Sequence, residues 1–298
     1  MEQTLKTGEY MLLPQSFKEW LEVLGYAKVT VDVLPLHTRS FLQYQEQQGN
    51  LSLQTITMAT AQSFIDHLRQ TPGRRTCKAL SAGHLNKYVQ ALNLFSRYLK
   101  ETGKANAGFQ LARIEDAKDK PAWLTKDEIQ ALYEATGDSV LGIRDRAMLS
   151  VYYGCGLRLN EGASLELKDI AGEKKLLHVR KGKHYKERYV PIAARNYEAI
   201  KLYVDYGRPQ LLQQYSTSAV FIDANKGCPM QKQSLYVRIK QLVKRAGIKK
   251  KVGTHTLRHS IATHLLQSGM RLEKIQEFLG HSSLDSTQLY THLANEQL

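Results

Sequence analysis

The sequence predicts a mainly α-helical protein with a small antiparallel β-sheet in its second half, an α+β arrangement preceded by a purely helical region. Apolar residues recur at three- and four-residue spacing through most of the first half, as they do along one face of a helix. A short charged segment ending in proline follows, near residue 120. The second half combines helical stretches with one pair of β-rich segments.

Composition limits the classes of protein to consider. The 298 residues are 42% hydrophobic and 23% charged, which fits a folded chain of two domains. The formal net charge of +14 favours an anionic partner such as nucleic acid, although a basic surface could also serve solubility alone.

Cysteine usage and the absence of targeting signals bear on the compartment. The three cysteines, Cys77, Cys155 and Cys228, are widely spaced and argue against a disulfide framework. The N-terminus lacks the pattern of a signal peptide, and no apolar stretch is long enough to cross a bilayer. We therefore expect a cytoplasmic protein with no membrane partner.

Residues 1–114 are expected to form the first, helical domain. Its clearest pattern is SAGHLNKYVQALNLFSRYLK at residues 81–100, where Ser81 is a candidate N-cap and Gly103 a candidate stop. Similar periodicity occurs in the segments 17–24, 30–45 and 60–68.

Residues 115–123 are expected to be a linker, and residues 124–298 a second domain. Thr125 and Glu128 match a capping box that begins a helix. Two β-rich runs, Leu177–Val179 and Tyr189–Ile192, predict a hairpin with a basic connection. Further helices are expected at residues 139–153, 196–206, 234–246, 256–268 and 272–279.

The first polar motif is GCGLRLNE at residues 154–161. Its glycines allow a tight turn after the preceding helix, and Arg158 and Glu161 then stand three apart on the same face of a new helix. Glu161 could hold the Arg158 side chain in place. Taken alone, the pair would be interpreted as a surface ion pair. Because Gly162 and Ala163 follow, we expect loose helix packing there.

The second motif, GKHYKER at residues 182–188, lies in the hairpin connection, where Lys183 could reach into a DNA groove or simply face solvent. The third contains His255 and Arg258, which can both donate hydrogen bonds to one oxyanion. A zinc site of His255 and His259 is the competing interpretation. It is disfavoured because residue 256 is Thr rather than the Glu of HExxH, and because Arg258 would repel a cation.

The fourth motif is LGH at residues 279–281, followed by Tyr290 nine positions after His281. A single tyrosine near a C-terminus is usually a packing residue. Here Thr287, Gln288, Thr291 and His292 surround it, and these polar neighbours are unusual for a buried aromatic ring.

These motifs occur in one order: GLR-x-x-E, GK-x-x-K-x-R before VPI, H-x-x-R, LGH and Tyr. This order resembles the tyrosine recombinase or phage-integrase family, and its Xer-like members in particular. The resemblance covers the chain from about Leu124 to the end. The first half is similar to the core-binding, SAM-like DNA-binding domain of that family, although it carries no sharp motif.

The resemblance implies a role for each matching residue. Tyr290 would be the nucleophile, and Arg158 and Arg258 would grip the scissile phosphate. Lys183 would be the general acid, with Lys181 and Lys186 as alternatives. His255 and His281 would complete the phosphate pocket, and Glu161 would support it from behind. No cofactor and no metal are implied, because arginine and histidine supply the positive charge.

The implied partners are double-stranded DNA target sites and further copies of the chain, assembled on DNA as a tetrameric synapse, with a second recombinase or accessory protein as an additional candidate. The implied location is the cytoplasm, in association with the nucleoid. The reaction would serve DNA integration and excision, inversion or dimer resolution. Two alternatives remain at this point: a type IB topoisomerase-like enzyme that reseals the same strand, and a catalytically silent DNA-binding regulator.

Overall fold

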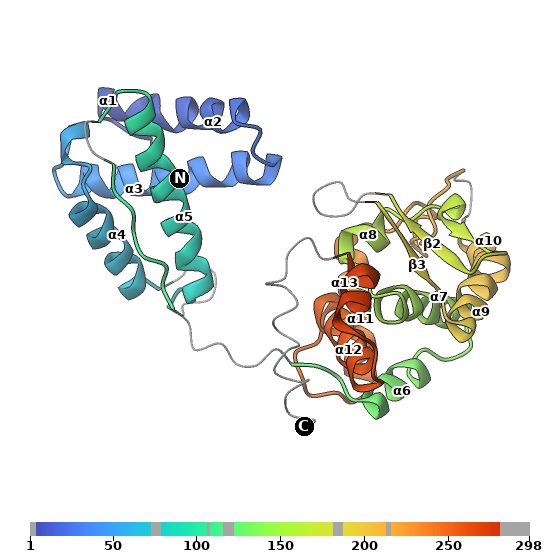
Figure 1. Cartoon of the computed structure of the whole chain (residues 1–298). Coiled ribbons are helices and arrows are strands. Elements are labelled where there is room, and N and C mark those ends of the chain that lie inside the picture. The colour runs from blue at the N-terminus through green and yellow to red at the C-terminus, as the bar shows by residue number, and fades with distance from the viewer. Residues whose placement is uncertain are drawn as a thin grey trace. The chain divides into compact units, whose positions relative to one another are not determined.

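The computed structural model describes residues 4–72, 79–105, 108–115, 122–180, 187–212 and 216–280. The chain divides into two compact units, Met1–Lys118 and Asp119–Leu298. Helices dominate both units, and the second also contains a three-stranded antiparallel sheet (Figure 1). The predicted fold class is confirmed. Among the described residues, no helix has the length and apolar character needed to cross a membrane.

The first unit is a bundle of helices around one apolar core. Its elements are α1 (Gly8–Met11), α2 (Leu13–Val23), α3 (Lys28–Gln47), the 3₁₀ turn η1 (Leu53–Thr55), α4 (Met58–Gln70) and α5 (Ala82–Glu101). Ser81 caps α5 by accepting a hydrogen bond from the His84 amide, and Gly103, with φ of 67°, follows its end. Both cap predictions are confirmed. Phe17 and Phe95 are fully buried, with ring centroids 5.4 Å apart.

The second unit begins with helices and returns to helices after its sheet. Its first elements are α6 (Lys126–Glu134), α7 (Val140–Leu149), the π-helical turn η2 (Ser150–Gly154), α8 (Leu159–Ala163) and the 3₁₀ turn η3 (Leu167–Asp169). The strands β1 (Ile170–Ala171), β2 (Leu176–Val179) and β3 (Arg188–Pro191) follow. The last elements are α9 (Ala194–Leu202), the π-helical turn η5 (Tyr203–Gly207), α10 (Arg208–Leu211), α11 (Lys232–Arg245), α12 (Thr254–Gln267) and α13 (Leu272–Leu279).

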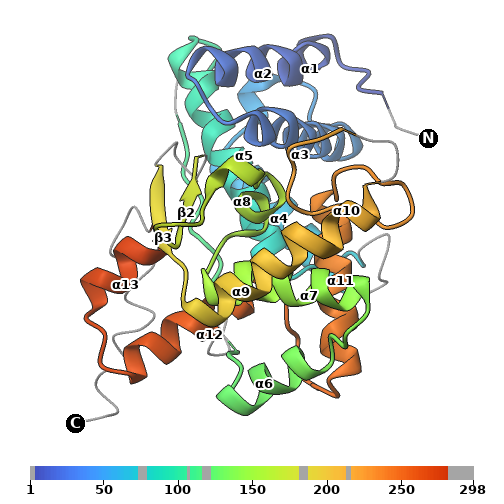
Figure 2. The ribbon, with the colours of Figure 1, turned by 90° about the vertical axis from the view of Figure 1, so that its right-hand side faces the viewer.

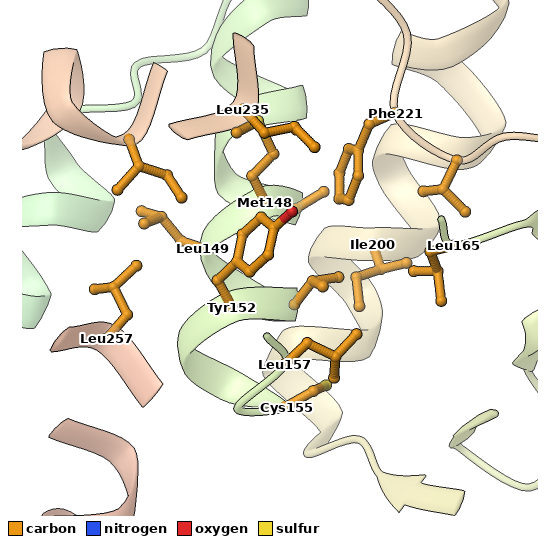
Figure 3. Packing of buried hydrophobic residues seen from close by; sticks show 14 of the residues in the cluster. Met148, Leu149, Tyr152, Cys155, Leu157, Leu165, Ile200, Phe221, Leu235 and Leu257 are labelled. Atoms are coloured by element: carbon orange, nitrogen blue, oxygen red, sulfur yellow. The ribbon is translucent and has the colours of Figure 1, made fainter. Parts of the chain in front are cut away.

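Helix α7 and the turn η2 form the centre of the second unit. Met148, Leu149 and Tyr152 are buried there, and side chains from surrounding helices close around them. Figure 3 shows the Tyr152 ring in this core, with Leu235 and Leu257 nearby. Because α7 is buried on most of its surface, the elements packed against it have fixed positions.

The sheet has the order β1-β2-β3, with His178 of β2 opposite Tyr189 of β3. The predicted hairpin is confirmed. Its connection, residues 181–186, lies outside the described residues. Strand β3 also packs against α13, which Figure 2 shows beside the sheet. The start of β3 at Arg188 is therefore close to the C-terminal helix of the described chain.

The start of the second unit is tied to α12. Of the expected linker at 115–123, residues 116–121 lie outside the described residues. The Leu124 amide donates to the Ser260 hydroxyl at 2.8 Å. Thr125 and Glu128 then form the predicted capping box, in which the Thr125 amide donates to the Glu128 carboxylate at 2.7 Å.

Candidate active site

A sharp turn after η2 delivers Arg158. The amide of Cys155 donates to the carbonyl of Ser150, the longer spacing of a π-helix, and Gly156 then adopts a φ of 62°. A Cβ atom at Gly156 would lie 2.8 Å from a methyl group of Leu279. Two independent reasons therefore require a glycine here: the left-handed backbone conformation and the close approach of α13.

The sequence predicted that Arg158 lies within a helix. The residue instead occupies the N-cap position, directly before α8. Its backbone conformation is extended, and its amide donates to Glu161 Oε2 at 2.9 Å. Its guanidinium Nη1 donates to Glu161 Oε1 at 2.8 Å. Glu161 thus holds the Arg158 side chain, as expected, and its backbone as well.

The ion pair between Arg158 and Glu161 is not a surface pair. The Glu161 side chain is only 2% exposed, against 21% for Arg158. Arg188 also donates to both oxygens of the same carboxylate, at 3.1 and 2.9 Å. Burial opposes ionisation of Glu161, but the hydrogen bonds and charges of Arg188 and then Arg158 lower its pKa to about 2. The surface interpretation is therefore wrong.

Arg258 enters the same region from the first turns of α12. It is 5% exposed, and its two terminal nitrogens donate to the backbone carbonyls of Gly156 at 2.6 Å and Leu279 at 2.7 Å. Both contacts are to residues within motifs found in the sequence, GCGLRLNE and LGH. They join the turn before α8 to the end of α13 through one guanidinium.

The end of α13 receives three arginines on three successive carbonyls. Arg188 Nε donates to Phe278 at 3.3 Å, Arg258 to Leu279, and Arg158 Nη2 to Gly280 at 3.2 Å. Carbonyls in the last turn of a helix have no partner within it, and they carry its negative dipole end. Three guanidiniums from different elements therefore converge on one helix terminus.

His255 lies in the first turn of α12, exposed to solvent. Partial burial lowers its pKa, and the positive charges of Arg258 and Arg158 lower it further. At neutral pH the imidazole is therefore uncharged. It sits within electrostatic reach of both arginines and can accept a proton.

Several of the predicted site residues cannot be placed. Lys183, with its alternatives Lys181 and Lys186, lies outside the described residues, and so do His281 and Tyr290. His281 directly follows Gly280, the last described residue. The structure thus brings together Arg158, Arg258, His255 and Glu161, four of the predicted residues.

Other histidines of α12 have different surroundings. His264 is 6% exposed, and its Nδ1 lies 2.9 Å from the Tyr153 hydroxyl, while Trp123 packs edge-on against its ring. Burial lowers the pKa of His259. Among the described residues, no group of three or more histidine, cysteine or acidic side chains is arranged to hold a metal.

The expected loose packing at Gly162 and Ala163 is wrong. A Cβ atom at Gly162 would lie 2.6 Å from ring atoms of Tyr152. The absence of a side chain therefore lets the buried Tyr152 ring lie directly against α8. The glycine fixes the position of the helix that carries Glu161 and follows Arg158.

A basic groove of about 400 Å³ lies beside the N-terminal end of α12. Four lysines line it, from the end of α11 and the loop that follows: Lys240, Lys244, Lys250 and Lys251. Lys250 is partly neutralised by Glu128 at 2.7 Å. The other three lysines give this surface a positive charge, and Lys251 stands four positions before His255 in the sequence.

Sequence reasoning missed the part played by Arg188. The sequence analysis included Arg188 only as the last residue of the motif GKHYKER. Its side chain is nearly buried, at 10% exposed, and contacts both Glu161 and α13. The alternation of β3 could have revealed it, because Arg188 and the buried Val190 share one face of the strand. An arginine on an inward face needs a buried acid as its partner.

Comparisons with known proteins identify a family for most of the second unit and relatives along nearly the whole chain. Residues 122–297 match the phage integrase family. Tyrosine recombinase XerD of Staphylococcus aureus (strain Mu50) is 41% identical over 287 residues, covering 94% of this chain and 95% of that protein. Tyrosine recombinase XerC of Oceanobacillus iheyensis is 32% identical over 288 residues, covering 95% and 92%.

The fold also matches solved structures. The XerH site-specific recombinase, bound to a palindromic difH substrate in a post-cleavage complex, superposes with a TM-score of 0.76. The match covers 97% of this chain and 94% of that chain, at 19% identity. At this identity the likeness concerns the fold alone.

Proposed function

We propose that this chain, which belongs to the phage integrase family and is a Xer-like tyrosine recombinase that cuts and rejoins DNA at specific sites, uses Tyr290 as its nucleophile. Arg158 and Arg258 hold the scissile phosphate, and His255 and His281 complete the pocket. Lys183 is the general acid. Residues 124–298 form the catalytic domain, and residues 1–114 form the core-binding domain on the other side of a linker.

The convergence of Arg158 and Arg258 on the end of α13 carries this proposal. The two guanidiniums come from distant parts of the chain and bind the carbonyls of Gly280 and Leu279. His281 is the next residue in the sequence. Fixed arginines at one place suit a phosphate, whose non-bridging oxygens gain negative charge in the pentacoordinate transition state.

The cleavage step balances without an external reagent. The Tyr290 oxygen attacks phosphorus, and the bond between phosphorus and the 5′ oxygen breaks, leaving a 3′-phosphotyrosyl bond. The hydroxyl proton passes to His255, which is neutral because burial and two arginines lower its pKa. Lys183 gives its proton to the departing 5′ oxygen. A 5′ hydroxyl of another strand then reverses these transfers and releases the tyrosine.

The basic groove supports contact with the DNA backbone. Lys240, Lys244 and Lys251 are exposed around it. Lysines placed in this way neutralise phosphates without reading sequence. The partner is therefore double-stranded DNA, and the recognition of individual target sites depends on other contacts.

Strand exchange between two sites sets the number of protomers. Each duplex must be cut in two strands, and each chain carries one Tyr290. Four protomers are therefore needed, which gives a tetrameric synapse of this chain, alone or with a second recombinase or accessory protein. The expected location is the cytoplasm, on the nucleoid where the DNA sites lie.

Covalent capture tests the nucleophile. Cells expressing the wild type or Tyr290→Phe are lysed in denaturant, and DNA attached to the protein is sequenced. We expect adducts at discrete sites from the wild type and none from the variant. Adducts from both proteins would show that another residue is the nucleophile, and adducts from neither would favour a silent DNA-binding regulator.

A strand-exchange assay separates recombination from simple relaxation. Two labelled duplexes that carry a captured site are mixed with the wild type. We expect joined products that contain strands from both duplexes. Nicking and resealing without exchange would instead indicate a topoisomerase-like enzyme.

A further inference from the structure

The hairpin arginine Arg188 is built into the network that holds the proposed phosphate-binding arginines. Its Nη1 and Nη2 reach the two oxygens of Glu161 at 3.1 and 2.9 Å. This bidentate contact fixes the plane of the carboxylate, because a guanidinium and a carboxylate match as two parallel hydrogen bonds. The Arg188 side chain is 10% exposed, so little water competes for the contact.

The carboxylate that Arg188 orients is the one that holds Arg158. Glu161 Oε1 accepts from Arg158 Nη1 at 2.8 Å, and Oε2 accepts from the Arg158 amide at 2.9 Å. Each oxygen thus serves both arginines. A rotation of the carboxylate would break the contacts with Arg158, and the bidentate grip of Arg188 opposes this rotation.

Arg188 also touches the end of α13. Its Nε donates to the Phe278 carbonyl at 3.3 Å. Gly280 adopts a φ of 66°, and a Cβ atom there would lie 2.7 Å from Arg188 Cδ. The glycine therefore makes room for the arginine. The backbone that leads into His281 lies against the Arg188 side chain.

The place of Arg188 in the chain adds a third connection. It begins β3, two residues after the segment 181–186 that contains Lys183. At the other end of that segment, Arg180 is bound to Asp169 and, at 3.3 Å, to Glu166. Arginine–carboxylate pairs therefore anchor both strands of the hairpin at the base of this connection.

We propose that Arg188 is a positioning residue for DNA cleavage, which holds Glu161 and through it Arg158, and which fixes the end of α13 in front of His281. It contacts neither nucleophile nor phosphate in this role. The inference rests on the proposed function, because it assigns Arg188 to the same reaction. It predicts that loss of Arg188 slows cleavage more than it weakens DNA binding.

The test uses purified full-length protein and a duplex oligonucleotide of a sequence recovered by covalent capture. The variants are Arg188→Gln and Arg188→Lys, and Arg195→Gln is the control that removes one positive charge from the exposed surface of α9. We measure DNA affinity and the single-turnover rate of covalent adduct formation from pH 7 to pH 5. For Arg188→Gln we expect an affinity within about threefold of the wild type and cleavage at least about tenfold slower, by analogy with groups that orient catalytic residues.

The pH profile distinguishes positioning from general loss of structure. In the wild type, Arg188 is the main partner that keeps the pKa of Glu161 at about 2, against the effect of burial. Without it, Glu161 takes up a proton at higher pH and releases Arg158. The rate of Arg188→Gln divided by that of the wild type should therefore fall as the pH is lowered from 7 to 5.

Arg188→Lys separates charge from geometry. A lysine keeps the positive charge beside Glu161 but cannot bind both carboxylate oxygens and the Phe278 carbonyl together. We expect a rate ratio that no longer depends on pH, with cleavage still slower than in the wild type. Wild-type rates in both variants, or equal pH-independent losses in both, would overturn the inference. A wild-type protein that forms no adduct would instead overturn the proposed function.

Discussion

The two units of this protein bury polar groups in different ways. In the first unit the buried polar side chains are neutral: Thr38, Gln45 and Ser96. Its ion pairs among the described residues, such as Arg97 with Glu101, have both partners well exposed. Among the described residues of the second unit, six charged side chains are buried: Arg144, Asp145, Glu161, Asp169, Arg208 and Arg258.

This difference shows that fixed, buried charge is concentrated in the second unit. Removing an ion from water costs several kcal/mol, so a buried charge persists only with close partners. Each buried guanidinium here has them. Arg208 donates to the Ala219 carbonyl at 2.9 Å, and Asp145 receives Arg238 through both oxygens. Some of these charges hold loops, and those around Glu161 hold the site.

The largest expected effect is on catalysis, for Arg258→Ala. Loss of one donor to a developing oxyanion costs about 10²- to 10³-fold in rate. We expect adduct formation to fall by this factor at saturating DNA, while binding persists through other phosphate contacts. The matched variant is Arg97→Ala in the first unit, which removes an exposed, paired arginine and should leave the rate within about twofold. A normal rate for Arg258→Ala would refute the phosphate pocket.

The next effect is on stability, for Glu161→Gln. Removing one member of a buried charge network costs about 3–5 kcal/mol, because its partners remain buried and unpaired. The matched change in the first unit, Glu101→Gln, should cost no more than about 0.5 kcal/mol. Equal losses would mean that the two units do not differ in the way the structure indicates.

The two tryptophans allow each unit to be followed separately. Trp20 packs in the first unit and Trp123 in the second. Urea unfolding is therefore measured by fluorescence in a Trp123→Phe background for the first unit and in a Trp20→Phe background for the second. The free energy of unfolding from each background gives the cost of the substitution in that unit.

A smaller effect is expected from adding one methyl group to a helical glycine in each unit. Gly162→Ala would press a Cβ atom into the Tyr152 ring, and overpacking of this kind costs about 1–3 kcal/mol. Gly83 of α5 has open space around its Cα, so Gly83→Ala should stabilise the first unit by up to about 1 kcal/mol. Adding Tyr152→Leu to Gly162→Ala should cost less than the sum of the single changes, and strict additivity would contradict the clash.

Local patterns predicted the local structure well. The cap at Ser81, the capping box at Thr125 and the hairpin of β2 and β3 all depend on residues close in sequence, and each is confirmed. Strand β1 was not predicted, because two residues are too few to show a period. The family and the enzymatic class, inferred from the order of the motifs, are confirmed by the matched family and relatives.

The site was predicted as a set of residues but not as a network. Spacing paired Arg158 with Glu161, yet it placed Arg158 inside a helix that it in fact caps. The contacts of Arg188 and Arg258 with α13 join residues 90 and 21 positions apart, respectively, and no local pattern encodes them. The roles of all the predicted site residues remain predictions that the proposed experiments test, and Lys183, His281 and Tyr290 also lie outside the described residues.

The smallest expected effect concerns a histidine that the first unit keeps neutral. Burial, then His84 and Lys87, lower the pKa of His37 from 6.5 to about 4, and its ring centroid lies 4.2 Å from that of Tyr88. The unfolded chain binds this proton more readily than the folded one. The stability of the first unit should therefore fall as the pH drops from about 6.5 towards 4.

His37→Phe keeps a ring against Tyr88 and removes the titration. Urea midpoints from Trp20 fluorescence at pH 7 and pH 5 should differ less in this variant than in its parent. Glu161 acts in the same direction but at lower pH, because its lowered pKa means that its stabilising contribution is lost only as the pH falls from 4.5 towards 2. If the stability of His37→Phe depends on pH as strongly as that of its parent, burial of this ring does not set the acid sensitivity of the first unit. The difference between the two units would then rest on their ion pairs alone.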